Sequence, residues 1–530
     1  PPPLKFLPTQ FDELIILPLP FLEEFIIENY QINDVATLAK IDYVTSFTNQ
    51  QKLAANSRVG IVVDCLDRCQ SFDEIIAIPD EINWLPDPLP SEYKFDLAIT
   101  ELLEISQDIR AAKKATSPYR AVELLKQPGD RLEDVQKNLA FSKSRHRPTL
   151  GQITQRWLSI LHTARENYQT LAANSSEIPQ AYIAGNSLSP ADAAERFKGR
   201  QDVFTQIENI SLSQSPPVLL LYGGRRTGKT SSLKYLPKNV NSRLIPLLVD
   251  LQGTATSNQL SSFAKEFAKQ IIDFARSRHN LRIEPPEAKR IETDPIATLQ
   301  DWLADIEALK PHANFLLCLD EYERLSEVID ATGSKAPLNF LRSTMQNNKR
   351  WILLFSGSHT LEELEPYWSD TLINAQSIRM SYLQRSEAID LIRHPVSDFP
   401  DIYTDAAVKR ILHWTNCQPY LIQMVGTVLV DTFNREKSDP RNSQATEADI
   451  DTIIPKVLER ANGYFNELWR KSITPKQQEI LTQFMLEGHL DGIQKVEINR
   501  LIFKEILQRE NGEFSFQVPL TEKYLRAQVE

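Results

Sequence analysis

Cysteine is scarce in this 530-residue chain, no apolar run is long enough to cross a bilayer, and no signal-peptide pattern opens the sequence. The four cysteines are too few and too scattered for a disulfide framework, which indicates a reducing, cytoplasmic compartment. Cys65 and Cys69 have no second Cys/His pair nearby at metal-ligand spacing, so we interpret them as structural cysteines. The first residue is Pro1 rather than methionine, which leaves open whether upstream residues are missing.

Positive charge is also in short supply. The chain has 59 Lys and Arg against 70 Asp and Glu, a net charge of −11. This balance argues against a protein that coats nucleic acid, although it is compatible with a local basic face.

The length exceeds what one compact core usually holds, and the composition is that of a globular protein. Changes of pattern along the chain predict four domains: residues 1–182, 183–384, 385–460 and 461–530. The first is mostly helical and shows no chemical constellation. One helical face is predicted from Leu150, Ile153, Trp157, Ile160, Leu161 and Ala164. The stretch "SRVGIVVDCL" (57–66) is predicted instead to be a buried strand.

Five apolar, strand-like runs alternate with helical stretches in the second domain. They are 217–223, 242–252, 314–322, 350–358 and 375–383. Continuous apolar runs separated by long connections are typical of a parallel sheet with helices on both faces.

Beyond about residue 384 the strand pattern gives way to helices, which predict a helical domain over 385–460. The last domain combines short helices with "NGEFSFQVPLTEKYL". There Asn511-Gly512 is a hairpin-turn signal between alternating polar and apolar residues. Helices followed by a hairpin favour a winged helix over 461–530.

The segment "GGRRTGKT" matches the phosphate-loop pattern G-x-x-x-x-G-K-[ST] and lies between an apolar strand and a plausible helix. Its glycines let successive backbone N–H groups point inward, and the following helix adds its positive end. Lys229 is predicted to contact the β- and γ-phosphates, and the Thr230 hydroxyl to bind Mg²⁺. We therefore predict nucleotide contacts from Gly223, Gly224, Arg225, Arg226, Thr227, Gly228, Lys229, Thr230 and Ser231.

An acidic pair, Asp320-Glu321, ends an apolar strand about ninety residues after the loop. Asp320 is predicted to hold the Mg²⁺ ion through its water shell, and Glu321 to polarise the attacking water. With Lys229 they form the predicted catalytic set. Two adjacent acids also place the chain with the P-loop NTPases that insert a strand between the two motifs, which predicts the sheet order 5-1-4-3-2.

Small polar residues end the next strand in "ILLFSGSH". One interpretation is that Ser356 or Ser358 senses the γ-phosphate or its water. The other is a strand-to-loop turn that needs Gly357.

Beyond these motifs, residues 183–530 resemble the STAND NTPases, signal-transduction ATPases related to the AAA+ proteins. The resemblance rests on "RFKGRQDVFTQIE" (196–208), on "YGGRRTGKTSSL", "LDEYERL" and "LLFSGS", and on "TNCQPYLIQ" (415–423). It implies that Phe197, Gly199 and Arg200 lie against the adenine of ATP or ADP, and that Pro419 meets the nucleotide from a helical lid. Cys417 and Gln418 depart from the Gly and His that are common in the family.

Two absences favour a slow switch over a motor. The segment 359–374 contains no Arg or Lys to act as the finger that AAA+ rings supply, and the lid shows no obvious second sensor arginine. Losing a finger costs roughly 10³–10⁵ in rate. Arg225 and Arg226 are the candidates to compensate within the same chain. A nucleotide-dependent homo-oligomer or a protein partner is then expected.

The competing interpretation is an AAA+ ATPase that acts on DNA, as an initiator or a transposition regulator does. From Phe465 onward there are nine Lys and Arg against ten Asp and Glu, so the predicted winged helix lacks the basic surface that phosphate contacts require. A third interpretation, a scaffold that binds nucleotide without hydrolysing it, is disfavoured by the acidic pair.

Overall fold

The computed structural model describes residues 22–45, 51–85, 96–115, 117–140, 144–185, 187–188, 190, 196–254, 259–358, 368, 372, 374–490 and 495–529. The chain forms two compact units, Pro1–Glu177 and Ile178–Glu530. Within the described ranges, no helix is both long enough and apolar enough to span a membrane.

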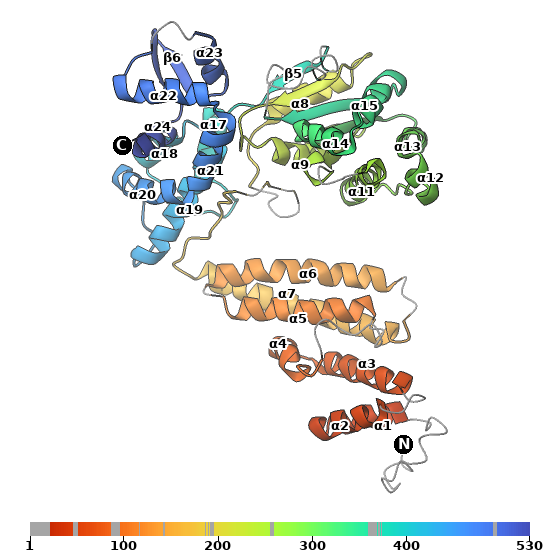
Figure 1. Ribbon diagram of the computed structural model, residues 1–530. Coiled ribbons are helices and arrows are strands. Elements are labelled where there is room, and N and C mark those ends of the chain that lie inside the picture. The colour runs from red at the N-terminus through yellow and green to blue at the C-terminus, as the bar shows by residue number, and fades with distance from the viewer. Residues whose placement is uncertain are drawn as a thin grey trace. The chain divides into compact units, whose positions relative to one another are not determined.

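The first unit is helical throughout its described residues (Figure 1). Its helices are α1 (Leu22–Tyr30), α2 (Asp34–Thr45), α3 (Gln51–Arg68), α4 (Phe72–Glu81), α5 (Leu97–Lys113), α6 (Pro118–Leu139) and α7 (Arg147–Ala173). The predicted face of α7 is confirmed, since Leu150, Ile153, Trp157, Leu161 and Ala164 are buried in one hydrophobic core. Ile160 packs against that core while only partly buried.

The predicted strand at 57–66 is wrong, because these residues lie in the middle of α3. Nearly the whole run from Val59 to Leu66 is buried, since α1, α2, α4 and α7 all contact this helix. A helix that is covered on most sides loses its polar stripe, so its apolar run cannot be told from a buried strand by periodicity.

The second unit contains a five-stranded parallel sheet. Its strands are β1 (Leu219–Tyr222), β2 (Leu244–Asp250), β3 (Asn314–Asp320), β4 (Trp351–Gly357) and β5 (Gln376–Arg379). They run in the order β2-β3-β4-β1-β5, which is the predicted 5-1-4-3-2 order counted from the opposite edge. The phosphate-loop strand is therefore central, between β4 and β5.

Helices cover both faces of this sheet, and alternate side chains of the strands enter two separate cores. Leu219 and Leu221 pack with α8 (Gln201–Ser211) and α9 (Lys229–Asn239), whereas Leu220 enters the opposite core. The helices on or beside the opposite face are α10 (Leu251–Thr254), α11 (Leu260–His279), α12 (Ala288–Thr293), α13 (Pro295–Leu309), α14 (Leu325–Thr332), preceded by the 3₁₀ turn η4 (Tyr322–Arg324), and α15 (Ala336–Asn347).

Helices follow β5, as predicted. They are α17 (Arg385–Arg393), α18 (Asp405–Thr415), α19 (Pro419–Glu436), α20 (Glu447–Arg460) and α21 (Asn462–Glu467), with a π-helical turn η6 (Leu468–Ser472). The chain ends with α22 (Pro475–Glu487), α23 (Lys495–Phe503), β6 (Leu507–Glu510), β7 (Glu513–Phe516) and α24 (Pro519–Val529). The antiparallel β6–β7 hairpin turns at Asn511 and Gly512, whose φ angles of 49° and 92° are those a tight hairpin turn requires.

An irregular segment, described at residues 178–185 and 187–188, begins the second unit and is called the strap below. Its first part follows α19. The Asn434 side chain bonds both the N–H and the carbonyl of Ile178, at 2.8 and 2.9 Å, and the Gln423 side chain accepts from Ile183 N at 2.9 Å. The strap therefore runs along α19 from its C-terminal turns towards its N-terminus.

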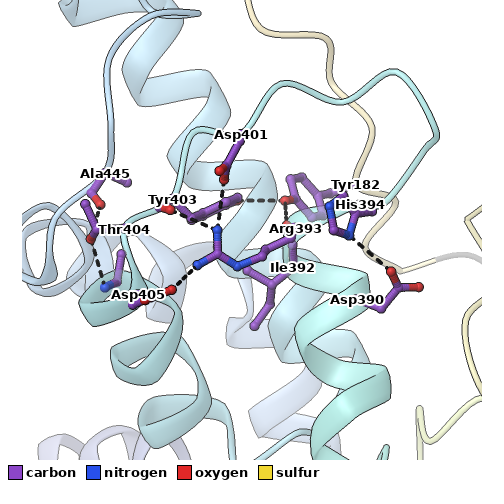
Figure 2. Close-up of polar contacts among 11 residues, drawn as sticks. Tyr182, Asp390, Ile392, Arg393, His394, Asp401, Tyr403, Thr404, Asp405 and Ala445 are labelled. Atoms are coloured by element: carbon purple, nitrogen blue, oxygen red, sulfur yellow. Dashed lines mark hydrogen bonds and ion pairs between the residues drawn. The ribbon is translucent and has the colours of Figure 1, made fainter.

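Tyr182 fixes the middle of the strap (Figure 2). Its hydroxyl donates to the carbonyl of Ile392 at 2.5 Å and lies 2.7 Å from the hydroxyl of Tyr403. Arg393 binds the same tyrosine, because its guanidinium donates to the carbonyl of Tyr403 at 3.1 Å. A Cβ on Gly426 would lie 2.6 Å from the Tyr182 ring, so only glycine lets α19 approach this closely.

Candidate functional site

The loop between β1 and α9 has the backbone of a phosphate-binding turn. Gly228 has φ 98° and Arg226 has φ 58°, so the chain turns through the left-handed region directly before the helix begins at Lys229. A Cβ on Gly223 would lie 2.1 Å from the carbonyl oxygen of Met380, which is why the loop must start with glycine.

Lys229 is buried at the centre of this loop. Its Nζ donates to the carbonyls of Gly223 and Gly224, each at 2.9 Å. Burial lowers the pKa of the Lys229 ammonium, and the charges of Asp320 and Glu321 oppose that shift. A buried ammonium inside a turn at a helix N-terminus is suited to an anion such as phosphate.

Asp320 joins the ends of β3, β4 and α9. Its two carboxylate oxygens accept from Thr230 Oγ1 at 2.5 Å and from Ser356 Oγ at 2.7 Å. The β3–β4 register pairs Asp320 with Ser356, so strand pairing itself brings the two together. Burial raises the pKa of the Asp320 carboxyl, and both hydroxyl donors oppose it. A hydroxyl beside a buried carboxylate supplies the hard oxygen donors that Mg²⁺ prefers, so the two residues fit the predicted ion site.

Glu321 follows Asp320 with φ 51°, which turns the chain away from the strand direction at the sheet edge. Burial, followed by the charges of Glu323 and Asp320, raises the pKa of its carboxyl. Ser358 bonds the neighbouring Glu323, whose Oε1 accepts from the Ser358 backbone N at 3.1 Å and from its Oγ at 3.0 Å.

Gly357 lies at the end of β4, where one interpretation of the sequence predicted a turn that requires glycine. A Cβ there would lie 2.1 Å from Glu323 Oε2 and 2.6 Å from the Tyr322 ring. Ser356 and Ser358 are thus both engaged with acidic side chains at this sheet edge, and a contact of either with phosphate stays a prediction.

The segment before α8 closes one side of the site. The ring of Phe197 stacks on that of Tyr235, with centroids 4.2 Å apart. A Cβ on Gly199, whose φ is 74°, would lie 2.4 Å from the carboxyl carbon of Glu387.

Arg200 connects this segment to the phosphate loop. Its guanidinium is buried and donates to the carbonyl of Thr227 at 2.7 Å and to that of Tyr382 at 3.4 Å. Its backbone N donates to Glu387 at 3.1 Å. The side chain therefore braces the loop against the chain that leads from β5 into α17.

A cavity of about 400 Å³ collects most of the predicted nucleotide contacts. Those that line it are Phe197, Arg200, Arg225, Arg226, Thr227, Gly228, Lys229, Thr230, Ser231, Glu321 and Pro419. Gly199, Gly223, Gly224, Asp320, Ser356 and Ser358 do not line it. The strap contributes Ile183, Gly185, Ser187 and Leu188 to the same wall, which sequence patterns did not reveal.

The two loop arginines bond to the helical region after β5. Arg225 forms an ion pair with Glu467 of α21, Nη1 to Oε1 at 2.8 Å. Arg226 lies over the Tyr420 ring at 4.7 Å and donates to the carbonyl of Gly185 at 2.8 Å. The sequence predicted a contact for Pro419 but singled out neither its neighbour Tyr420 nor Glu467.

Glu505, from the C-terminal part of the chain, also lies close to the phosphate loop. This buried carboxylate, in the turn between α23 and β6, accepts from Arg379 at 3.1 Å and from the Ser381 hydroxyl. Its other oxygen lies 3.9 Å from where a Cβ of Gly224 would be. Nearby, the Phe503 ring stacks on Tyr222 at the end of β1, with centroids 5.5 Å apart.

Neither a protein-family model nor a curated protein matches this sequence. Among solved structures, the Walker-type ATPase paby2304 of Pyrococcus abyssi matches with a TM-score of 0.47 and 15% identity, over 66% of this chain and 99% of that one. The Aeropyrum pernix ORC1 protein, solved in complex with DNA, matches with a TM-score of 0.34 and 12% identity, over 64% and 94%. The Thermotoga maritima RuvB Holliday junction branch migration motor matches with a TM-score of 0.32 and 13% identity, over 62% of this chain and 95% of that one.

Proposed function

We propose that this chain is an ATP-binding and slowly hydrolysing switch of the STAND type, whose ADP or ATP state controls domain opening and self-association or partner binding. The observation that carries the proposal is that Arg225 and Arg226, both inside the phosphate loop, are bonded to Glu467 and Tyr420 of the helical region. A loop that is coupled to neighbouring domains can pass on a change in its bound nucleotide.

The residues have separate roles in this proposal. Lys229 binds the β- and γ-phosphates. Thr230 and Asp320 would hold Mg²⁺, which supplies charge neutralisation on the phosphates when bound. Glu321 orients and polarises the attacking water, and its raised pKa, caused by burial, suits a proton acceptor.

A slow rate of ATP hydrolysis is consistent with the contacts that the two loop arginines make. Arg225, whose charge Glu467 already pairs, is not available to stabilise a transition state without a rearrangement. Residues 359–374, which lack Arg and Lys, lie mostly outside the described residues. We propose that the P-loop NTPase domain spans 183–384, the helical lid 385–460 and the winged helix 461–530.

In the cycle that we propose, ADP holds the lid and the winged helix against the loop through the Arg225–Glu467, Arg226–Tyr420 and Glu505 contacts. Exchange for ATP and Mg²⁺, triggered through residues 1–182, releases these contacts and exposes surfaces for self-association. Hydrolysis restores the closed form.

The test compares nucleotide occupancy, turnover and mass for the wild type, Lys229→Ala and Glu321→Gln. The wild type is expected to retain ADP and to hydrolyse ATP slowly, and Lys229→Ala to lose binding. Glu321→Gln is expected to enlarge with ATP and to stay small with ADP. Brisk turnover that DNA stimulates would overturn the switch and favour an AAA+ ATPase acting on DNA. Tight ATP binding with no turnover in the wild type would favour the scaffold.

A further inference from the structure

Part of the cavity wall is formed by apolar side chains with one amide among them. The strap, the chain entering α17 and the first turns of α19 contribute these residues. Its apolar side chains are Ile183, Leu188, Leu383, Leu391 and Pro419, and Gln423 lies among them. Apolar walls of this kind suit the flat faces of a nucleotide base, whereas the edge of a base needs a polar partner.

The hydrogen bonds of Gln423 fix which way its amide is turned. The side chain is 6% exposed, and its oxygen accepts from the backbone N–H of Ile183 at 2.9 Å. Because an N–H can only donate, the amide oxygen must face the strap and the Nε2 group must face elsewhere. Among the described residues, the bonds of Gln423 involve its side-chain oxygen and its backbone carbonyl, and Nε2 donates to no protein acceptor.

The Nε2 group of Gln423, at the cavity wall, needs a hydrogen-bond acceptor. Because Gln423 is mostly buried and lines the cavity, the acceptor for its Nε2 group is a ligand or water in that cavity. A purine base offers ring nitrogens as acceptors and flat faces for the apolar walls.

We infer that the side-chain amide of Gln423 donates a hydrogen bond to a ring nitrogen of the adenine base, and so acts as a base-reading residue of the site. The inference rests on the proposed nucleotide function. Because the oxygen of the same amide holds Ile183, one side chain ties the bound base to the strap. The base and the strap therefore stabilise each other's position.

The test measures the affinities of ADP and of inorganic tripolyphosphate, each with Mg²⁺, by titration calorimetry on the full chain. Gln423→Glu keeps an acceptor for the N–H of Ile183 and removes the donor. Asn434→Asp is the matched control, because it makes the same change on α19 at the strap contact with Ile178, outside the cavity. Tripolyphosphate carries no base, so its binding reports an intact phosphate loop.

Gln423→Glu is expected to bind ADP at least tenfold more weakly than the wild type and tripolyphosphate within twofold of it, with both affinities unchanged in Asn434→Asp. Equal ADP affinities in Gln423→Glu and the wild type would overturn the inference. An equal loss for ADP and tripolyphosphate would also overturn it, because the effect would then come from charge or packing. If the wild type binds neither compound, the proposed function itself fails, and the inference fails with it.

The 1-deaza, 3-deaza and 7-deaza analogues of ADP identify the acceptor. The analogue that lacks the contacted nitrogen is expected to bind the wild type and Gln423→Glu equally. If all three retain the difference between the two proteins, no ring nitrogen accepts from Gln423, and the assignment is wrong.

Discussion

At the scale of single residues, the site depends on groups that are buried in fixed geometry. Asp320 is the clearest case, since strand register places Ser356 beside it and the first turn of α9 delivers Thr230 to its other oxygen. None of these three side chains can move far without disturbing the sheet edge. The chemistry of the site is therefore set by backbone placement more than by flexible side chains.

Gly357 gives a prediction at this scale. In Gly357→Ala the new Cβ would collide with Glu323 and Tyr322, so we expect a loss of about 1–3 kcal/mol in the free energy of unfolding. Urea denaturation measures it. Gly463→Ala is the control, because a Cβ there meets nothing within 4 Å, and it is expected to be neutral or to stabilise by up to about 1 kcal/mol. Equal stabilities for the two variants would contradict the steric argument.

Tyr182 gives a second prediction. Tyr182→Phe removes the hydroxyl that bonds the carbonyl of Ile392 and contacts Tyr403, both in a buried setting. We expect a loss of about 1–3 kcal/mol, because buried polar groups would be left without their partner. Thermal or chemical unfolding of the variant checks this. A change below about 0.5 kcal/mol would mean that the strap is not anchored at this point.

At the scale of elements, the contacts of the loop with α19, α21 and the α23–β6 turn decide how nucleotide and domains are coupled. Glu467→Gln removes the charge that pairs Arg225, while the amide keeps the shape of the side chain. A partly exposed ion pair contributes about 1 kcal/mol, so we expect ADP to dissociate about fivefold faster. Stopped-flow release of a fluorescent ADP analogue measures the rate.

Glu436→Gln is the matched control for that experiment, because Glu436 pairs with Arg435 on the exposed end of α19, away from the cavity. Its release rate is expected to equal that of the wild type. Unchanged release in Glu467→Gln would show that the ion pair does not contribute to retention of ADP.

Glu505 gives a prediction about pH. Burial raises the pKa of its carboxyl, while Ser381 and Arg379 oppose the shift. In the folded protein, the Glu505 carboxyl therefore binds its proton more tightly than it does in the unfolded chain, where it is solvated. The contribution to stability is complete below the usual glutamate pKa of about 4.3 and is lost as pH rises through the raised value.

Urea unfolding at several pH values between 4.5 and 7.5 tests this for the wild type and Glu505→Gln. The variant is expected to gain stability relative to the wild type as pH rises, with a slope of at most about 1.4 kcal/mol per pH unit. Parallel stability curves for the two proteins would contradict a raised pKa at this position.

At the scale of the whole molecule, the two units have separate cores. Scanning calorimetry of the full chain is therefore expected to show two transitions. ADP with Mg²⁺ at about 100 times its Kd stabilises the binding unit by about 2.7 kcal/mol, so only one transition should rise. A single transition, or an equal rise of both, would mean that the units unfold together.

The sequence by itself determined the elements whose physics is local. The phosphate-loop glycines are required by backbone geometry and Asn511-Gly512 by a tight turn. The apolar runs that alternate with helical stretches predicted strands covered on both faces. The phosphate loop and the acidic pair together predicted the strand order, through the class of P-loop NTPases in which both occur. The stretch 57–66 was predicted wrongly, because burial on most sides removed the polar stripe that identifies a helix.

Only the tertiary structure decided which distant residues meet at the loop. Glu467 and Glu505 belong to no motif, since a glutamate on a helix or turn looks the same whether it faces solvent or an arginine, and the motif that ends at Gln423 does not show that its side chain meets Ile183. Their roles depend on packing between segments separated by more than a hundred residues. Such packing is set by the summed burial of many side chains, which no short pattern in the sequence records.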